Sequence, residues 1–246
     1  MRTYGQYCPI ARTAELFAER WTPIIIRNLA AGCTTFTQLR DGAPGIPKAL
    51  LADRLSQLER SGVLARTPRS AGRGSHYALT ESGRELKRVC DAMGEWGARW
   101  LELEPHHLDP AYVLWATCRL VDLARIPQSG VVVRFDLRDE RRRFWMLLQR
   151  PRVEMCTSYP GREEDLLVTA DSETLALWNL RRISFDDAVR DGRCRIEGAP
   201  QLARAFPTWI RPSPFAHVAS ADRSADLAPR PRRGGVRTVA RATAAD

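Results

Sequence analysis

The apolar residues of the N-terminal part recur at helical spacing in several separate runs. The clearest run predicts a helix over 46–61, with Pro47 at its start and Gly62 just after its end. The outer face of this helix carries hydrogen-bonding side chains such as Gln57, with Lys48 at the N-terminal end. A short helix of this kind fits the major groove of DNA. Its apolar members stand at i, i+4 and i+7 and form one buried stripe: Leu51, Leu55 and Leu58.

A second helix is predicted directly upstream, and the two together form a helix–turn–helix. Thr35 and Gln38 have the spacing of a capping box, in which each side chain satisfies a backbone N–H at the helix start. The turn over 42–45, which contains two glycines and a proline, links this helix to the one over 46–61. Two earlier amphipathic helices are marked by apolar residues at similar spacing: Ile10, Ala14 and Phe17 in the first, and Trp21, Ile25 and Leu29 in the second.

A β-hairpin follows, with strand-like stretches over 63–67 and 75–79. The connecting loop, 68–74, holds two glycines, one proline and two arginines, a composition that cannot pack a core. Such a loop can lie along DNA phosphates as a wing. Arg69 and Arg73 are therefore expected to contact phosphate or the minor groove rather than base edges in the major groove.

A long amphipathic helix over 80–103 comes next, and its apolar face is too extensive for water on a small domain. We expect it to pack against its mate in a symmetric homodimer, so the DNA site should be a two-fold operator. Packing on the chain's own second half is the alternative. The apolar residues recur every three or four positions: Leu86, Val89, Met93, Trp96 and Trp100.

The pattern changes in the second half of the chain. Residues 105–110 break the long helix and mark a domain junction, and another helix is expected over 112–125. Strands followed by helices indicate an α+β domain, with helices covering one face of an antiparallel sheet. Alternation with period two and then helical spacing predict these elements: strands over 131–135, 143–148, 153–155, 166–169 and 193–197, and helices over 172–180, 184–189 and 200–206.

About the first 95 residues resemble the HxlR family of bacterial winged helix–turn–helix transcriptional regulators, which are dimers. The resemblance implies that the helix from Ile46 is the recognition helix and that 66–76 form the wing. Pro47 and Ala49 depart from the family's pattern in the first turn of that helix. The motifs that carry the resemblance are CPIAR at 8–12, RWT at 20–22, FTQL at 36–39, RLSQL at 54–58, GVL at 62–64 and YALTESG at 77–83.

Because of those two departures, base contacts are expected from Lys48, Arg54 and Gln57 rather than from the first turn. Arg54 matches the family pattern and is expected to contact a guanine edge. The full set of predicted DNA contacts is Thr35, Thr37, Lys48, Arg54, Gln57, Arg69, Arg73 and His76.

Residues 128–210 resemble the sterol carrier protein type-2 domain, through DLLVTAD at 165–171, the helix with Leu175 and Trp178, and AVRDGRCRIEG at 188–198. The resemblance implies a tunnel between sheet and helices that holds a small apolar ligand. A core role for the same aromatic residues is the alternative. The predicted ligand contacts are Phe144, Trp178, Phe185 and Phe206.

The charge distribution supports a nucleic-acid partner. The chain holds 38 basic and 29 acidic residues, a net charge of +9. Residues 1–90 hold 14 basic and 7 acidic side chains, whereas 105–220 hold 17 and 15. A positive field on the DNA-reading part steers it towards phosphate, with a merely soluble basic surface as the alternative. No run approaches the roughly 20 apolar residues that span a bilayer, and no signal-peptide core is present, so a cytoplasmic protein without membrane contact is expected.

The six cysteines are scattered, without a Cys-x-x-Cys pair, which favours reduced thiols over disulfides or a metal site. His106 and His107 are interpreted as a pair in the junction. No nucleophile elbow, phosphate-binding glycine loop or His-Glu-x-x-His motif occurs, so the sequence predicts no enzyme, no cofactor and no metal. Some members of the HxlR family sense oxidants or electrophiles through a cysteine near the N-terminus. Cys8 is the candidate here, because Arg12 and a helix start are close; an inert cysteine is the alternative.

These observations predict four parts. Residues 1–104 form the DNA-binding and dimerisation domain, 105–127 a linker and connecting helix, 128–215 a ligand-binding domain, and 216–246 a disordered basic tail. The predicted function is a transcriptional regulator, most simply a repressor, whose operator affinity changes with a small apolar ligand. The alternative is a lipid carrier or partner-binding protein whose N-terminal half only dimerises or tethers it.

Overall fold

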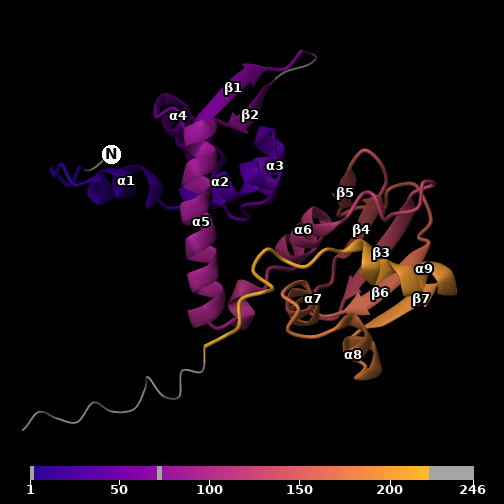
Figure 1. Cartoon of the computed structure of the whole chain (residues 1–246). Helices are drawn as coiled ribbons and strands as arrows, with labels where there is room; N and C mark the ends of the chain where they lie inside the picture. The colour runs from indigo at the N-terminus through magenta and orange to yellow at the C-terminus, as the bar shows by residue number, and fades with distance from the viewer. Residues whose placement is uncertain (1–2, 71–73, 222–246) are drawn as a thin grey trace, which may run out of the picture.

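The computed structural model describes residues 3–70 and 74–221, so the predicted wing contact Arg73 and the chain beyond 221 lie outside it. The N-terminal part is a winged helix–turn–helix followed by a long helix (Figure 1), which confirms the fold predicted for it. Its elements are α1 Pro9–Phe17, α2 Thr22–Ala30, α3 Phe36–Asp41, α4 Lys48–Arg60, β1 Leu64–Pro68, β2 Ser75–Leu79 and α5 Glu81–Trp100.

Local chemistry fixes the ends of these helices. The capping box of α3 is present: Thr35 Oγ1 accepts the Gln38 N–H at 3.3 Å, and Gln38 Oε1 accepts the Thr35 N–H at 3.2 Å. The turn before α4 contains Gly45 at φ +82°, a left-handed conformation that favours glycine. Gly83 in the first turn of α5 lets that helix approach the Val63 carbonyl, because a side chain there would overlap the oxygen.

The core of the winged domain lies between α2, α3, α4 and the hairpin. The prediction for α1 is wrong in one respect: Phe17 is buried, but Ile10 is 80% exposed. The C-terminal end of α1 lies against the domain, and the rest of the helix extends away from it, so Ile10 does not reach the core (Figure 1). The buried residues include Ile25, Ile26, Leu39, Leu51, Leu55, Leu58, Val63 and Leu64.

The second domain is a sheet covered by helices, the α+β arrangement that the sequence predicts. Apolar residues of the sheet pack against α6, α7, α8 and η2 to form its core. Its elements are η1 Pro105–His107, α6 Pro110–Leu120, β3 Val131–Leu137, β4 Arg143–Leu148, β5 Val153–Cys156, β6 Leu166–Ala170, α7 Ser172–Asn179, α8 Phe185–Arg190, β7 Arg195–Gly198, α9 Pro200–Ala205 and η2 Phe206–Trp209.

The sheet has the strand order β5-β4-β3-β6-β7. Three of its strand pairs are antiparallel as predicted, but β3 and β6 run parallel, with Val133 opposite Leu166. The parallel pair arises because residues 157–165 carry the chain from the edge strand β5 to the far side of β3. In a fully antiparallel sheet, β6 would run opposite to β3.

The four aromatic residues predicted to line a ligand tunnel lie in the core of the second domain, the alternative that the sequence left open. Phe144, Trp178, Phe185 and Phe206 are all buried, and three of them pack ring against ring. The ring centroids of Trp178 and Phe185 are 4.9 Å apart, and those of Phe185 and Phe206 are 5.7 Å apart. At these separations the rings contact each other directly, so they form the core between sheet and helices.

Helix α6 belongs to both domains, which the prediction of a connecting helix did not include. One face, with Val113, Leu114 and Cys118, joins the core of the second domain. The other face carries Tyr112 and Trp115, which pack in the core of the winged domain. Figure 1 accordingly shows α6 between the helix–turn–helix and the sheet.

The chain after η2 returns from the second domain to α5 (Figure 1). The Arg211 N–H donates to the Leu120 carbonyl at 2.8 Å, and the Ala221 N–H donates to the Arg99 carbonyl at 2.8 Å. The ring of Phe215 lies directly against Gly94 of α5, where any side chain would overlap it. The predicted tail therefore begins later than residue 216, and its part over 222–246 lies outside the described residues.

Candidate nucleic-acid interface

The outer face of α4 is polar and accessible, as the sequence predicts. Leu51, Leu55 and Leu58 hold the inner face in the core. Lys48 is exposed at the N-terminal end of the helix, and Gln57 is half-buried two turns later. The helix lies beside the β1–β2 hairpin, so both elements can face one DNA duplex (Figure 1).

The side chain of Arg54 is paired with other residues of the protein and is not free to contact DNA on this face. Its guanidinium contacts the Glu19 carboxylate at 2.6 Å and Gln57 Oε1 at 2.8 Å, and its side chain is only 12% exposed. Arg54 Nε also donates to the Arg20 carbonyl at 3.4 Å, while Gln57 Nε2 donates to Asp53 at 3.1 Å. The network joins α4 to the connection between α1 and α2. In this structure Arg54 therefore orients α4, and the predicted contact with guanine would require it to leave Glu19.

The start of α3 is held against the hairpin. Thr35 forms an isolated β-bridge with His76, and the Tyr77 N–H donates to the Thr34 carbonyl at 2.8 Å. The Thr35 hydroxyl is used for helix capping, whereas Thr37 is exposed on α3 and His76 is exposed on β2. The structure thus brings these predicted contacts together on neighbouring elements.

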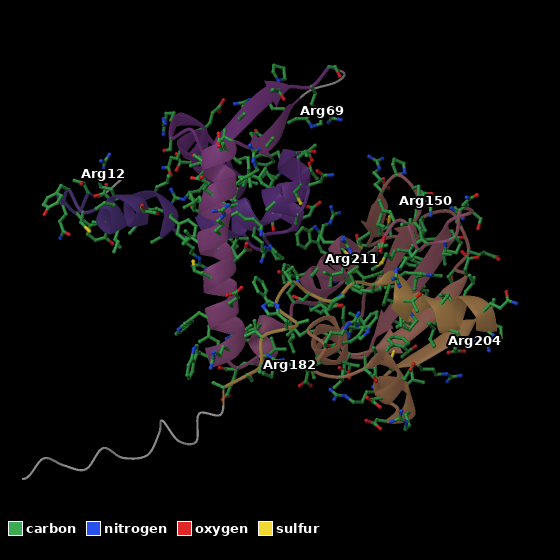
Figure 2. The ribbon with its side chains drawn as sticks, in the orientation of Figure 1. Arg12, Arg69, Arg150, Arg182, Arg204 and Arg211 are labelled. Atoms are coloured by element: carbon green, nitrogen blue, oxygen red, sulfur yellow. The ribbon has the colours of Figure 1, made fainter. Side chains whose placement is uncertain are left out.

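The hairpin projects from the domain as a wing (Figure 2). Arg69 is exposed near its tip, and its backbone N–H donates to the Gly74 carbonyl at 3.2 Å. Arg66, also exposed on β1, donates from Nε to Ser75 Oγ at 2.9 Å. Arg66 is a cation of the wing that the predicted set of contacts omits, although its position next to the basic loop could have indicated it.

Cys8 is half-buried at the N-terminal end of α1, and its carbonyl accepts the Arg12 N–H at 3.0 Å. Burial raises the pKa of Cys90 to about 11, of Cys118 to about 12 and of Cys194 to about 11, so these thiols stay protonated at neutral pH.

Within residues 3–70 and 74–221, no group of three or more metal-ligating side chains is found. None of the helices in these ranges has the length and apolar character of a membrane span.

Comparison with known proteins places the N-terminal part in a family. The model of the HxlR-like helix-turn-helix family matches residues 16–105. A helix-turn-helix-type transcriptional regulator of Synechocystis is 37% identical over 102 residues, which cover 41% of this chain and 75% of that protein. The transcriptional regulator YodB of Bacillus subtilis is 32% identical over 101 residues, which cover 39% of this chain and 87% of YodB.

A solved UbiJ-SCP2 ubiquinone synthesis protein has 18% identity and a TM-score of 0.30, and covers 35% of this chain and 69% of that chain. A similarity of this size assigns no family to the second domain.

For the N-terminal part, the matched span holds all of α2 to α5 and the wing. The resemblance inferred from the sequence motifs is therefore confirmed. The chain belongs to the HxlR-like helix-turn-helix family.

Proposed function

We propose that this chain is a dimeric DNA-binding transcriptional regulator, acting as a repressor, in which α4 enters the major groove and the wing follows the backbone. The observation that carries the proposal is the exposed polar face of α4 beside a wing that presents Arg66 and Arg69. This combination supplies hydrogen bonds for base edges and cations for phosphates. Repression follows most simply, because a dimer bound over a promoter excludes polymerase.

The second copy is proposed to pack on α5. Val89, Met93 and Trp96 lie at helical spacing on one face of α5 and are 42%, 51% and 58% exposed. An exposed apolar stripe of this length on a soluble helix marks an interaction surface. A second copy of the same chain is the occupant we propose, since a symmetric pair also presents two α4 helices to a two-fold operator.

Within this dimer, Lys48, Thr37 and Gln57 are proposed to contact DNA from the helix–turn–helix, and His76 and Arg69 from the wing. Arg54 and Thr35 are proposed to position these elements, because Arg54 is paired with Glu19 and the Thr35 hydroxyl caps α3. Gln57 would have to exchange its hydrogen bonds with Arg54 and Asp53 for contacts to a base edge. Cys8 is proposed as a thiol open to oxidants or electrophiles at the start of α1.

Wing contacts should be visible in the salt dependence of binding. Arg69→Ala should weaken binding to the chain's own upstream DNA and to a scrambled duplex by similar factors. It should also reduce the slope of log K against log salt by about 0.9 per lost phosphate contact in each half-site. Fluorescence anisotropy over a salt series measures both effects. Arg204→Ala, on α9 and away from the wing, is the matched control (Figure 2). An unchanged slope for Arg69→Ala would show that the loop only connects two strands.

The role of Arg54 can be separated from base reading by a pair of variants. Arg54→Ala and Glu19→Gln should each lower the free energy of unfolding, by about 1–3 kcal/mol, because each removes the charge-assisted contact of 2.6 Å between the two side chains. Both should weaken binding to operator and to scrambled DNA by equal factors. The result would instead support the guanine contact if Arg54→Ala lost DNA affinity at one base position only and Glu19→Gln bound DNA like the wild type.

We further propose that the second domain regulates DNA binding in response to a small molecule. The carrier alternative requires an apolar tunnel, and the aromatic residues expected to line it pack as core. The shared helix α6 gives the second domain direct contact with the helix–turn–helix. A reporter fused to the bound promoter would test regulation: deleting the gene should raise expression if the protein represses.

A further inference from the structure

One contact between the two domains lies at the turn that precedes α4. The ring of Trp115 lies directly under Gly42, where any side chain would overlap it. Arg27 joins the same parts, because its guanidinium donates to the Gly42 carbonyl at 2.9 Å and to the Tyr112 hydroxyl at 2.9 Å. A shift of α6 would therefore move the turn that orients α4.

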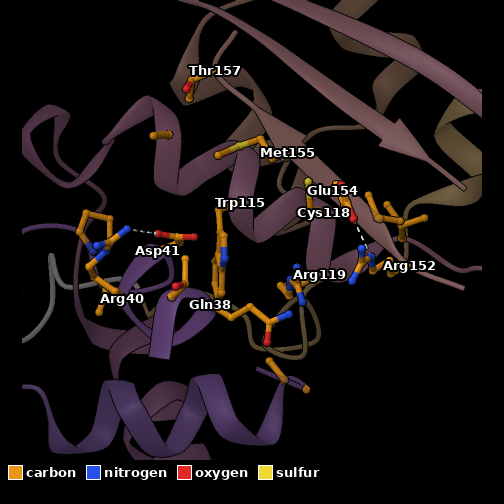
Figure 3. Close-up of a pocket in the computed structure, with 18 of the residues that line it drawn as sticks. Gln38, Arg40, Asp41, Trp115, Cys118, Arg119, Arg152, Glu154, Met155 and Thr157 are labelled. Atoms are coloured by element: carbon orange, nitrogen blue, oxygen red, sulfur yellow. Dashed lines mark ion pairs between the residues drawn. The ribbon is translucent and has the colours of Figure 1, made fainter. Parts of the chain in front are cut away.

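A cleft of about 1100 Å³ opens beside this contact (Figure 3). Its walls come from the ends of α2 and α3, the turn 43–46, α6 and β5, so both domains contribute. The turn forms part of the wall itself, which places any occupant next to the start of α4. The side chains that matter for its chemistry are Arg40, Trp115, Arg119, Arg152, Met155 and Arg211.

The cleft carries unbalanced positive charge. Its lining includes five arginines against three carboxylates, one of which, Asp109, is used to cap α6 through the Tyr112 N–H at 2.7 Å. Three of the arginines contact neighbouring carboxylates: Arg40 with Asp41 at 3.5 Å, Arg142 with Glu140 at 2.6 Å and Arg152 with Glu154 at 2.6 Å.

The remaining two arginines, Arg119 and Arg211, form no ion pair within the part of the chain that the structure describes. Arg119 Nε is buried and has no hydrogen-bond acceptor there. The guanidinium of Arg119 lies 5.5 Å from the ring centre of Trp115, which orients it along the cleft wall. A buried donor without an acceptor is unfavourable. An anion in the cleft would balance the charge of the guanidinium, which no carboxylate pairs with in the described part of the chain.

We propose that this cleft binds a small organic anion. Arg119 and Arg211 hold its charged group, and Trp115 and Met155 contact its apolar part. The anion differs in class and in place from the apolar ligand expected within the aromatic core. Its effect on DNA rests on the proposed function: occupancy favours one arrangement of α6 and the turn 43–46, and operator affinity changes only by the difference in anion affinity between the two arrangements.

The binding step can be tested without DNA, by calorimetry on the full chain. The probes are benzoate, phenylacetate and indole-3-acetate, with benzyl alcohol as the matched neutral compound. At least one anion should bind at one site per chain, and benzyl alcohol should not. Arg119→Gln and Arg211→Gln should each weaken that binding by about tenfold, the size of one lost charge-assisted contact. Arg204→Gln, an exposed arginine outside the cleft, should bind like the wild type.

Absence of binding by all three anions at millimolar concentration would overturn the proposal, and so would equal binding by the wild type and both variants. Because Arg211 is exposed, its replacement should leave the fold intact even if Arg119→Gln does not. Anisotropy with upstream DNA then provides the second arm. DNA binding that fails in the wild type overturns the proposed function but not the anion site. If the two variants lose DNA affinity while no anion binds, the cleft contacts DNA phosphate instead and the proposal fails.

Discussion

Replacing Trp96 by arginine should convert the proposed dimer to monomers and weaken binding to a two-half-site operator by about 100-fold or more. The physical reason is that two α4 helices joined in one dimer bind their half-sites with a high effective concentration, which separate monomers lack. Trp96 is 58% exposed in the single chain, so a charge there costs little within one protomer. Desolvating the same charge at a packed apolar interface is strongly unfavourable.

Light scattering after gel filtration gives the mass, and anisotropy gives the affinity. Val189→Arg is the matched control, because Val189 is also an exposed apolar residue but lies on α8 of the second domain. It should leave mass and affinity unchanged. A Trp96→Arg protein that remains dimeric with full affinity would place the dimer interface elsewhere.

Replacing Trp115 by alanine should cost about 3–5 kcal/mol of unfolding free energy, the range for a large buried aromatic. Trp115 is 7% exposed, stacks on Tyr112 with ring centres 5.8 Å apart, and lies within 6.0 Å of the Arg27 guanidinium. Because these contacts join the two domains, the variant should unfold in two separate transitions in urea, whereas the wild type should unfold in one.

Trp145→Ala provides the comparison, since Trp145 is equally buried but lies on β4 within the second domain. It should destabilise the protein without separating the domains and without changing DNA affinity. Retention of a single transition in Trp115→Ala would show that the domains are coupled through other contacts, such as those of Phe215 with α5.

The sequence predicted local structure well because local chemistry determined it. The Thr35–Gln38 capping box, the Leu51–Leu55–Leu58 stripe and the wing all depend on residues close together in the chain. The period-two runs likewise predicted the strands of the second domain. These features arise from the spacing of neighbouring residues, so the order of amino acids is enough to predict them.

What the sequence did not predict depends on contacts between distant segments. The helical pattern through Leu114 and Cys118 indicated one buried face of α6, and nothing local indicated that Trp115 fills the other. Arg54 matched a DNA-reading motif, but its partner Glu19 lies 35 residues away. The parallel pairing of β3 with β6 and the exposure of Ile10 are also tertiary outcomes.

The double packing of α6 has a consequence for how this protein can be dissected. The family match ends at residue 105, which invites removal of everything after it. Such a truncation would leave the site of Trp115 beside Gly42 empty and would expose apolar surface on the helix–turn–helix. We therefore expect the smallest fragment that keeps the DNA-binding domain fully packed to end at Leu120, the last residue of α6. A chimera joined at that residue would keep α6 packed against the helix–turn–helix. In this chain the end of the family match and the end of the segment that packs on the DNA-binding domain lie at different positions.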